Sequence, residues 1–274
     1  MTQKVIRFFI GTFLILFFVN ARAAKADTLV VYSNCMKKNI KTCVITPESY
    51  SNTNKIFPVV YLLHGYSGNY ATWLKSFKNI KNDVDHYQFI VVCVDGNYSS
   101  WYFDSPIDTK SKYETYITTE LIPYIDQKYR TKTNREFRAI SGLSMGGHGA
   151  LYLAFKHQDV FSVAGSMSGG VDLRPFPNNW DIAKRIGTYA AKPNNWESRS
   201  VVNLTHLLTP NSLALFIQCG TEDFFYKVNV QLHEKLAYHN IPHSFMANPG
   251  AHNWQYWSDA IKYQLLFIKA NLKN

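Results

Sequence analysis

Gly142-Leu143-Ser144-Met145-Gly146 is a complete G-x-S-x-G pattern inside the longer stretch Arg138-Ala-Ile-Ser-Gly-Leu-Ser-Met-Gly-Gly-His-Gly-Ala150. Residues 137–141 read as a short buried strand, and residues 149–155 read as the start of an apolar helix. A strand-to-helix turn this sharp needs glycines around the serine, because Cβ atoms there would clash with the passing chain. The turn presents the hydroxyl at the top of the sheet, beside the positive end of the helix. The context predicts a nucleophile elbow, with Ser144 as the nucleophile.

Short apolar runs alternate with helical stretches through the rest of the chain. Buried strands alternating with helices predict an α/β fold, with a mostly parallel sheet of about eight strands covered by helices on both faces. A chain of 274 residues suits one such domain, which we assign to residues 28–274. The expected strands are 28–33, 40–46, 58–63, 89–94, 137–141, 161–167, 213–219 and 243–248, and the expected helices are 71–81, 113–129 with a kink at Pro123, one from 149, 228–239 and 257–271.

The first residues have the layout of a secretory signal peptide. Lys4 and Arg7 precede an apolar run over residues 8–19, and small-x-small cleavage sites follow at residues 21–26. The run is too short to span a membrane comfortably. We therefore assign residues 1–23 to a cleaved signal peptide and expect an exported protein with no stable membrane span. An uncleaved anchor is the alternative.

Charge and composition narrow the functional classes. Export would remove three basic residues and lower the formal net charge from +10 to about +7. The basic residues are spread along the chain, apart from a cluster at Lys37, Lys38 and Lys41, so a solubility charge explains them better than an acidic polymer or anionic lipid. No helix-turn-helix, zinc-finger or RNA-binding signature is present, so no nucleic-acid partner is expected.

Four cysteines in an exported chain raise the question of a disulfide. Cys93 and Cys219 lie in apolar runs and are expected to be buried free thiols. Cys35 and Cys43 flank a predicted hairpin turn, but a symmetric register would not place them opposite each other, so we expect no bridge. No cysteine or histidine spacing predicts a metal site.

Two later loops can complete a serine site. A serine nucleophile needs a histidine base and an acid that orients the base. After an elbow of this kind, the acid and then the histidine follow at the carboxyl ends of later strands. Those placements select Asp223 and His252, with Glu222 as the competing acid. The remaining histidines of the later chain read as packing or surface residues: His148, His157, His233, His239 and His243.

The oxyanion of an acyl-transfer reaction needs two backbone donors. One is expected to be the amide of Met145, directly after the nucleophile. The other is expected from the glycine turn that ends the strand 58–63, at the amide of Tyr66. Residues 171–210 show weak periodicity and read either as a lid or as a long connection, and Asp172 at their start has a substrate-loop or structural role.

Six motifs fall in the order and spacing of a known family. They are Leu62-Leu-His-Gly-Tyr-Ser-Gly68 with Trp73, Ser100-Trp-Tyr-Phe-Asp-Ser-Pro106, Glu120-Leu-Ile-Pro-Tyr124, Gly142-Leu-Ser-Met-Gly-Gly147, Gly220-Thr-Glu-Asp223 and Gly250-Ala-His-Asn-Trp254. From about residue 30 to residue 267, the chain resembles the esterase D-like branch of the α/β-hydrolases. That branch includes S-formylglutathione hydrolases, short-chain carboxylesterases, feruloyl and acetylxylan esterases and mycolyltransferases. The resemblance implies an α/β-hydrolase fold and the same triad and oxyanion residues.

The resemblance and the export signal together imply a secreted serine carboxylesterase. Its expected substrates are short acyl or hydroxycinnamoyl esters, free or linked to carbohydrate, and it needs no cofactor or metal. Trp73, Trp101 and Tyr102 lie near the same sheet edge and are expected to contact the substrate, although they could instead only pack the loops. The alternatives are an acyltransferase to a sugar hydroxyl and a non-catalytic carbohydrate-binding protein. Oligomeric state is not predicted.

Overall fold

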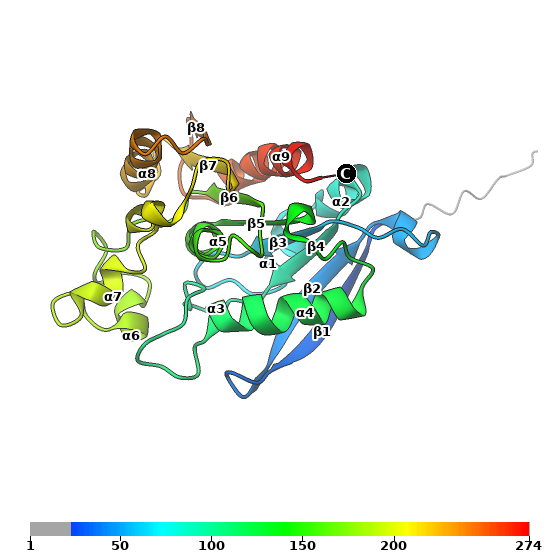
Figure 1. Cartoon of the computed structure of the whole chain (residues 1–274), viewed down its shortest axis with the longest axis horizontal. Helices are drawn as coiled ribbons and strands as arrows, with labels where there is room; N and C mark the ends of the chain where they lie inside the picture. The colour runs from blue at the N-terminus through cyan, green and yellow to red at the C-terminus, as the bar shows by residue number, and fades with distance from the viewer. Residues whose placement is uncertain (1–22, 274) are drawn as a thin grey trace, which may run out of the picture.

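Eight strands form one sheet in residues 23–273, the part of the chain that this computed structural model describes. They are β1 (Lys25–Ser33), β2 (Lys38–Thr46), β3 (Val59–Leu63), β4 (Ile90–Val94), β5 (Arg138–Leu143), β6 (Val163–Met167), β7 (Ala214–Gly220) and β8 (Ser244–Asn248). Their order in the sheet is β1-β2-β4-β3-β5-β6-β7-β8 (Figure 1). β1 and β2 pair antiparallel, β2 joins β4 antiparallel, and every later pairing is parallel. The predicted eight-stranded, mostly parallel sheet is confirmed.

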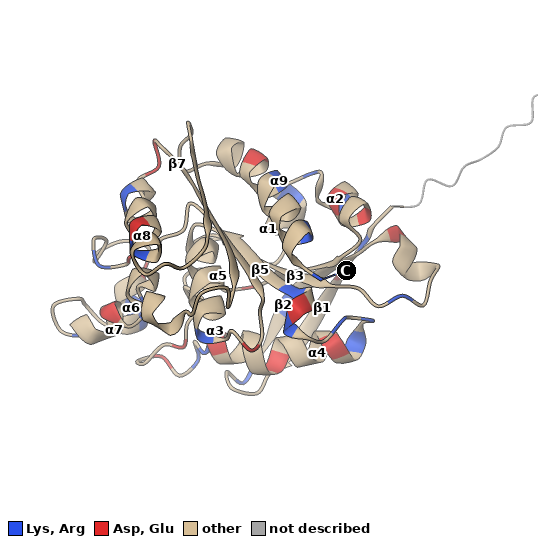
Figure 2. Cartoon of the chain, turned by 45° about the horizontal axis from the view of Figure 1, so that its top comes forward, with Lys and Arg blue, Asp and Glu red and all other residues tan. Residues whose placement is uncertain are grey.

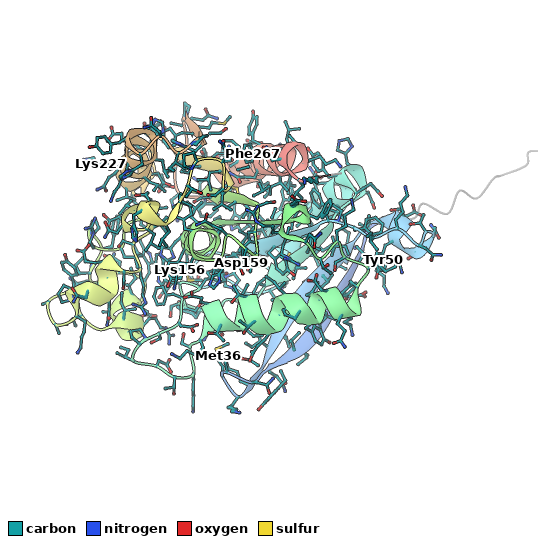
Figure 3. All side chains as sticks on the ribbon, in the orientation of Figure 1. Met36, Tyr50, Lys156, Asp159, Lys227 and Phe267 are labelled. Atoms are coloured by element: carbon teal, nitrogen blue, oxygen red, sulfur yellow. The ribbon has the colours of Figure 1, made fainter. Side chains whose placement is uncertain are left out.

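Helices cover both faces of this sheet. They are α1 (Thr72–Ser76), α2 (Ile80–Tyr87), α3 (Tyr113–Thr115), a π-helix (Tyr116–Leu121), α4 (Ile122–Lys128), α5 (Met145–Lys156), α6 (Ile182–Ile186), α7 (Pro193–Glu197), α8 (Tyr226–Tyr238) and α9 (Trp254–Asn271). Alternate residues of β3 enter different cores, since Tyr61 belongs to the cluster that includes residues of α4, α5 and α8, and Leu62 belongs to the cluster that includes residues of α1, α2 and α9. Figure 1 shows α8 and α9 on either side of β7. Phe267 of α9, labelled in Figure 3, packs 5.1 Å from Phe216 of β7 between ring centroids.

Two predicted helices differ from the structure. The predicted helix at 71–81 is two helices, because the backbone at Phe77 leaves helical geometry and its side chain is buried in the core of that face. The predicted kink at Pro123 is replaced by the π-helix that directly precedes α4. Proline has no N–H to give to the carbonyl four residues earlier, and a wider helical turn accommodates that missing hydrogen bond.

The segment 171–210 packs onto the domain through short helices. α6 and α7 lie at one end of the molecule (Figure 1), and Trp196 of α7 is fully buried. Arg174 joins two parts of this segment, because it contacts Asp172 at 2.8 Å and Glu197 at 2.8 Å. Asp172 therefore has the structural role that the sequence left as one of two possibilities.

Acidic and basic residues are mixed on the outer helices. Figure 2 shows both signs side by side on α4, α8 and α9. No helix among residues 23–273 is long and apolar enough to cross a bilayer. The predicted signal peptide, apart from Ala23, lies outside the described residues.

All four cysteines are free, as expected for Cys35 and Cys43. The backbone N–H and thiol of Cys35 face Glu120 of the π-helix. The partner of Cys43 in the β1–β2 hairpin is Thr28 rather than Cys35. On its other side, Cys43 lies opposite Cys93 across the antiparallel β2–β4 pair, and both thiols are buried. Burial in the sheet keeps both from solvent-borne oxidants.

A thiol titration tests this reading of the cysteines. We expect four reactive thiols per chain when the purified protein is denatured without reductant. Two thiols would instead mean that one bridge forms in solution. Peptide mapping under non-reducing conditions would then distinguish Cys43–Cys93, which the strand pairing favours, from Cys35–Cys43.

Candidate active site

The serine of the G-x-S-x-G pattern lies on a strained turn between β5 and α5. Ser144 has φ 56° and ψ −120°, in a region of the backbone map that residues with a Cβ rarely occupy. Its amide donates to the carbonyl of Met167 in β6 at 2.9 Å, and its own carbonyl accepts from His148 at 3.0 Å. These bonds fix the turn, so that the side chain points away from β5 and the helix. The predicted elbow geometry is present.

Glycine at two positions of the elbow is a steric requirement. A Cβ on Gly146 would lie 2.3 Å from the carbonyl oxygen of Leu63, at the end of β3. A Cβ on Gly142 would lie 2.5 Å from the backbone of Gly146. Both obstacles are backbone atoms and cannot move aside as a flexible side chain would. The elbow therefore packs directly against the end of the neighbouring strand.

Ser144, His252 and Asp223 form one hydrogen-bonded line. His252 Nε2 lies 2.9 Å from Ser144 Oγ, and His252 Nδ1 lies 2.7 Å from Asp223 Oδ2. The three residues follow the ends of β5, β7 and β8, which meet at one edge of the parallel part of the sheet. In this arrangement Nδ1–H donates to the carboxylate, and Nε2 is left to accept the serine proton. The structure brings together the three residues that the sequence selected.

Asp223, rather than Glu222, occupies the acid position. The Asp223 side chain is fully buried, and its second oxygen accepts the backbone N–H of Phe225 at 2.8 Å. The carboxylate is thus held by two donors, which fixes its orientation toward the imidazole. Glu222 is exposed and makes no hydrogen bond to the histidine. Its side chain faces a different cavity.

The two backbone amides predicted for the oxyanion hole are both available. Neither the N–H of Met145 nor that of Tyr66 donates a hydrogen bond to any residue in 23–273. Gly65 brings the second amide close to the nucleophile, because a Cβ there would lie 3.4 Å from the Cβ of Ser144. Two unpaired donors beside a hydroxyl are the arrangement that stabilises a tetrahedral oxyanion. Their role in that stabilisation stays a prediction.

A cavity of about 370 Å³ opens over the serine. Ser144, His252 and the Gly65–Gly68 turn form its polar side. Aromatic residues from the later half of the chain form most of the rest, namely Trp180, Phe224, Trp254 and Trp257, and Thr72 and Leu143 complete the lining. The ring of Phe224 lies 4.2 Å from that of His252 and 5.3 Å from that of Trp180, so one aromatic wall continues from the histidine to the 171–210 segment.

The predicted substrate contacts of Trp73, Trp101 and Tyr102 are wrong for this cavity. All three side chains are buried at 0–1% exposure, and none lines it. Trp73 Nε1 donates to the carbonyl of Leu63, and Tyr102 Oη donates to the carbonyl of His64 at 2.9 Å. They hold the end of β3, from which the oxyanion turn begins. Trp101 supports the aromatic side of the cavity, because its Nε1 donates to the carbonyl of Trp180 at 3.2 Å.

The aromatic residues that do line the cavity were largely missed in the sequence. Trp254 ends the motif Gly250-Ala-His-Asn-Trp254, and Phe224 directly follows Asp223. Their place within two residues of Asp223 and His252 is the sequence signal that could have found them. Trp180 had no usable signal, because residues 171–210 show neither helical nor strand periodicity.

Two buried histidines next to the site are held neutral. Burial lowers the pKa of His64, whose Nε2 accepts the N–H of Gly96 at 2.8 Å and whose Nδ1–H therefore donates to the Gly65 carbonyl at 2.7 Å. Burial also lowers the pKa of His148, to about 4. Its ring nitrogens lie 3.2 Å from the carbonyl of Trp101 and 2.7 Å from that of Arg199. A neutral imidazole carries one N–H, so His148 donates one hydrogen bond, which we assign to Nε2 and the Arg199 carbonyl at the shorter distance, and it joins the elbow helix to that loop.

A search for known relatives places the chain among esterases. The family model described as "Putative esterase" matches residues 33–268. An esterase of Mycobacterium tuberculosis is 33% identical over 134 residues, which cover 48% of this chain and 29% of that protein. The match thus spans less than a third of that relative. An acetyl esterase of Caldicellulosiruptor saccharolyticus is 24% identical over 254 residues, covering 84% of this chain and 92% of that protein.

A solved structure gives the same result for the fold. A ferulic acid esterase superposes with a TM-score of 0.80 at 27% sequence identity, covering 92% of this chain and 100% of that one. The α/β-hydrolase fold expected from the motifs is therefore confirmed, and so is the esterase D-like resemblance.

The neutral state of His148 predicts a pH-dependent stability. Its folded pKa of about 4 lies below the ordinary value of 6.5, so the unfolded chain binds more protons between those values. Stability present above pH 6.5 is therefore lost as pH falls towards 4, by about 3 kcal/mol. We expect His148→Gln to flatten the fall in Tm between pH 6.5 and 4. The matched variant His206→Gln, at an exposed histidine, should keep the wild-type slope. Equal slopes for all three proteins would remove His148 as the cause.

Proposed function

The chain belongs to the esterase family whose model it matches, and from that membership we propose that it is a serine carboxylesterase. The observation that carries the proposal is the hydrogen-bonded line Ser144–His252–Asp223 opening into an aromatic-walled cavity beside two unpaired amides. A nucleophile, its base, the group that orients the base and an oxyanion site are all within reach of one bound ester.

The reaction would proceed through an acyl-enzyme. His252 takes the Ser144 proton as the hydroxyl oxygen attacks the ester carbonyl, while Asp223 holds the ring and stabilises its charged form. The amides of Met145 and Tyr66 bind the tetrahedral oxyanion. The alcohol leaves with the proton from His252, and a water molecule then repeats the attack on the acyl group. These steps need neither a metal nor an organic cofactor.

We infer short acyl or hydroxycinnamoyl esters, attached to carbohydrate, as the substrates. A cavity of about 370 Å³ is small, and the stacked rings of Trp180 and Phe224 form an aromatic wall beside the histidine. Such a wall suits a short chain or a planar aromatic acyl group better than a long lipid. The similarity to an acetyl esterase and to a ferulic acid esterase supports both acyl classes.

Export is part of the proposal and rests on the sequence. Residues 1–23 have the charge, length and cleavage-site pattern of a secretory signal peptide. An exported enzyme would meet polysaccharide esters outside the cytosol, which agrees with the substrate class above. The acyltransferase alternative differs only in the acceptor, because a sugar hydroxyl would replace the water of the second step.

Substitutions of the three residues test the mechanism. Ser144→Ala should abolish hydrolysis of p-nitrophenyl acetate without loss of Tm, since the hydroxyl contributes little to packing. His252→Ala should lower activity comparably, and it also leaves the buried Asp223 carboxylate without its partner, so its Tm is expected to fall. Asp223→Asn should lower kcat by about 10³- to 10⁴-fold, because the imidazole loses the partner that sets its tautomer. Glu222→Gln is the matched control and should keep wild-type kcat. Retained activity in Asp223→Asn together with its loss in Glu222→Gln would reverse the acid assignment.

A panel of esters tests the substrate class. We expect release of acetate or ferulate from acetylated and feruloylated xylan oligosaccharides, and a preference for p-nitrophenyl acetate and butyrate among chain lengths. Added sugar acceptors should leave the yield of free acid unchanged if water is the acceptor, whereas acylated sugar would indicate transfer. A preference for chains beyond about ten carbons, with nothing released from the oligosaccharides, would contradict the proposal, because the cavity is too small for them.

A further inference from the structure

A second cavity, of about 610 Å³, lies behind the loop that carries His252. Three segments line it: the end of β7 with the loop after it, the end of β8 with the loop after it, and the first three turns of α9. It is larger than the cavity over Ser144 and falls within the size range of ligand sites. Neither the triad residues nor the two amides of the oxyanion hole line it. Its polar side chains include Glu222, Asn248, Asn253, Gln255, Asp259 and Tyr263.

Much of this lining has unused hydrogen-bonding capacity. The side chains of Glu222, Asn248, Gln255 and Tyr263 make no hydrogen bond to any other residue in 23–273, although they surround one cavity. Together they offer carboxylate and amide acceptors, amide donors and a phenol hydroxyl. Tyr263 is 47% exposed and also presents a ring face. Amide, carboxylate and aromatic groups around an open cavity suit a ligand that carries many hydroxyl groups on an apolar ring.

The charge of the lining favours a neutral ligand over an acidic one, because Glu222, Asp259 and Lys262 together carry one net negative charge. Glu222 is unpaired, and the carboxylate of Asp259 is matched by Lys262 at 2.8 Å. The cavity is therefore neutral to slightly negative, in a chain whose formal net charge is +10. A carboxylate beside the ligand would repel an acidic polymer and accept hydroxyl donors from a neutral one.

The cavity is joined to the active site through the two loops that hold the triad. Glu222 lines the cavity and precedes Asp223, and Ala251 lines it and precedes His252. The loops are tied by two backbone bonds, in which the N–H of Thr221 donates to Asn248 at 2.9 Å and that of Glu222 donates to Gly250 at 3.0 Å. The loop after β8 thus places His252 at the cavity over Ser144, and it places the neighbouring residues Ala251 and Asn253 at the second cavity.

We propose that this second cavity binds a neutral saccharide segment of the polymer that carries the scissile ester. A chain held there would lie beside the His252 loop, which keeps further ester groups of the same chain near Ser144 and raises their effective concentration. The inference rests on the proposed function for its choice of polymer, and on the lining of the cavity for its choice of a neutral sugar.

Binding is measured with unesterified xylo-oligosaccharides on the full chain. First, the protein is labelled with a fluorophosphonate, in which Ser144 Oγ displaces fluoride from phosphorus and the acyl cavity is filled. We expect the labelled protein to keep its affinity for the oligosaccharide, and to show none for polygalacturonate. Displacement of the oligosaccharide by the label would mean that it binds over Ser144 and would overturn the proposal.

Variants of exposed residues then locate the site. Gln255→Ala combined with Tyr263→Ala should weaken oligosaccharide binding by about tenfold, since a stacking surface and an amide are both lost. It should also raise KM for acetylated xylan by a similar factor. Tyr238→Ala, at an 83% exposed tyrosine of α8, is the matched control and should bind as the wild type does.

The outcomes separate this inference from the proposed function. A protein that neither reacts with the fluorophosphonate nor cleaves p-nitrophenyl acetate would contradict the esterase proposal itself. A protein that does both, but binds no oligosaccharide or binds it equally well after the double substitution, would contradict only the second site.

Discussion

The contact between the elbow and the end of β3 is the constraint on which the site depends. Gly146 passes so close to the carbonyl of Leu63 that no side chain fits between them. That contact fixes β5 and α5 against the strand from which the Gly65 turn begins, and so sets Ser144 and the two amides in one place. The strained backbone of Ser144 lowers the stability of the fold by about 1–3 kcal/mol. It persists because the packing around the turn leaves no room for a relaxed conformation.

Most of the fold and the triad could be predicted because the relevant signals are local. Buried parallel strands are apolar runs, and the carboxyl ends of such strands meet at one edge of the sheet. A serine, an acid and a histidine that follow the ends of β5, β7 and β8 must therefore come together, whatever lies between them. The same reasoning located the amides of Tyr66 and Met145. It fails where helices must adapt to a side chain, as at Phe77 and Pro123, and in the segment 171–210, whose short helices follow no periodic pattern.

Aromatic residues beside the site could not be assigned in the same way. Trp101 and Tyr102 lie on the expected loop, but both have positive φ, and the chain there turns their rings inward. A sequence places a residue along a loop and does not say on which side of the loop its ring lies. The residues chosen as substrate contacts are instead one layer deeper, where they hold the Leu63–His64 carbonyls and Trp180. Trp180 lies in a segment with neither helical nor strand periodicity, so no sequence pattern predicted its place at the site.

Burial and hydrogen bonding explain why His252 can act as a base and why His64 and His148 cannot. A base must offer a free lone pair to the serine hydroxyl and tolerate a positive charge. His64 and His148 have both ring nitrogens turned to backbone groups, and burial lowers their pKa values, so neither meets either condition. His252 is 14% exposed, presents Nε2 to Ser144 and has the buried carboxylate of Asp223 behind it. In the sequence, His252 was predicted as the base from its position after a strand. Its contacts with Ser144 and with the buried Asp223 carboxylate are the physical reason why it can act as one.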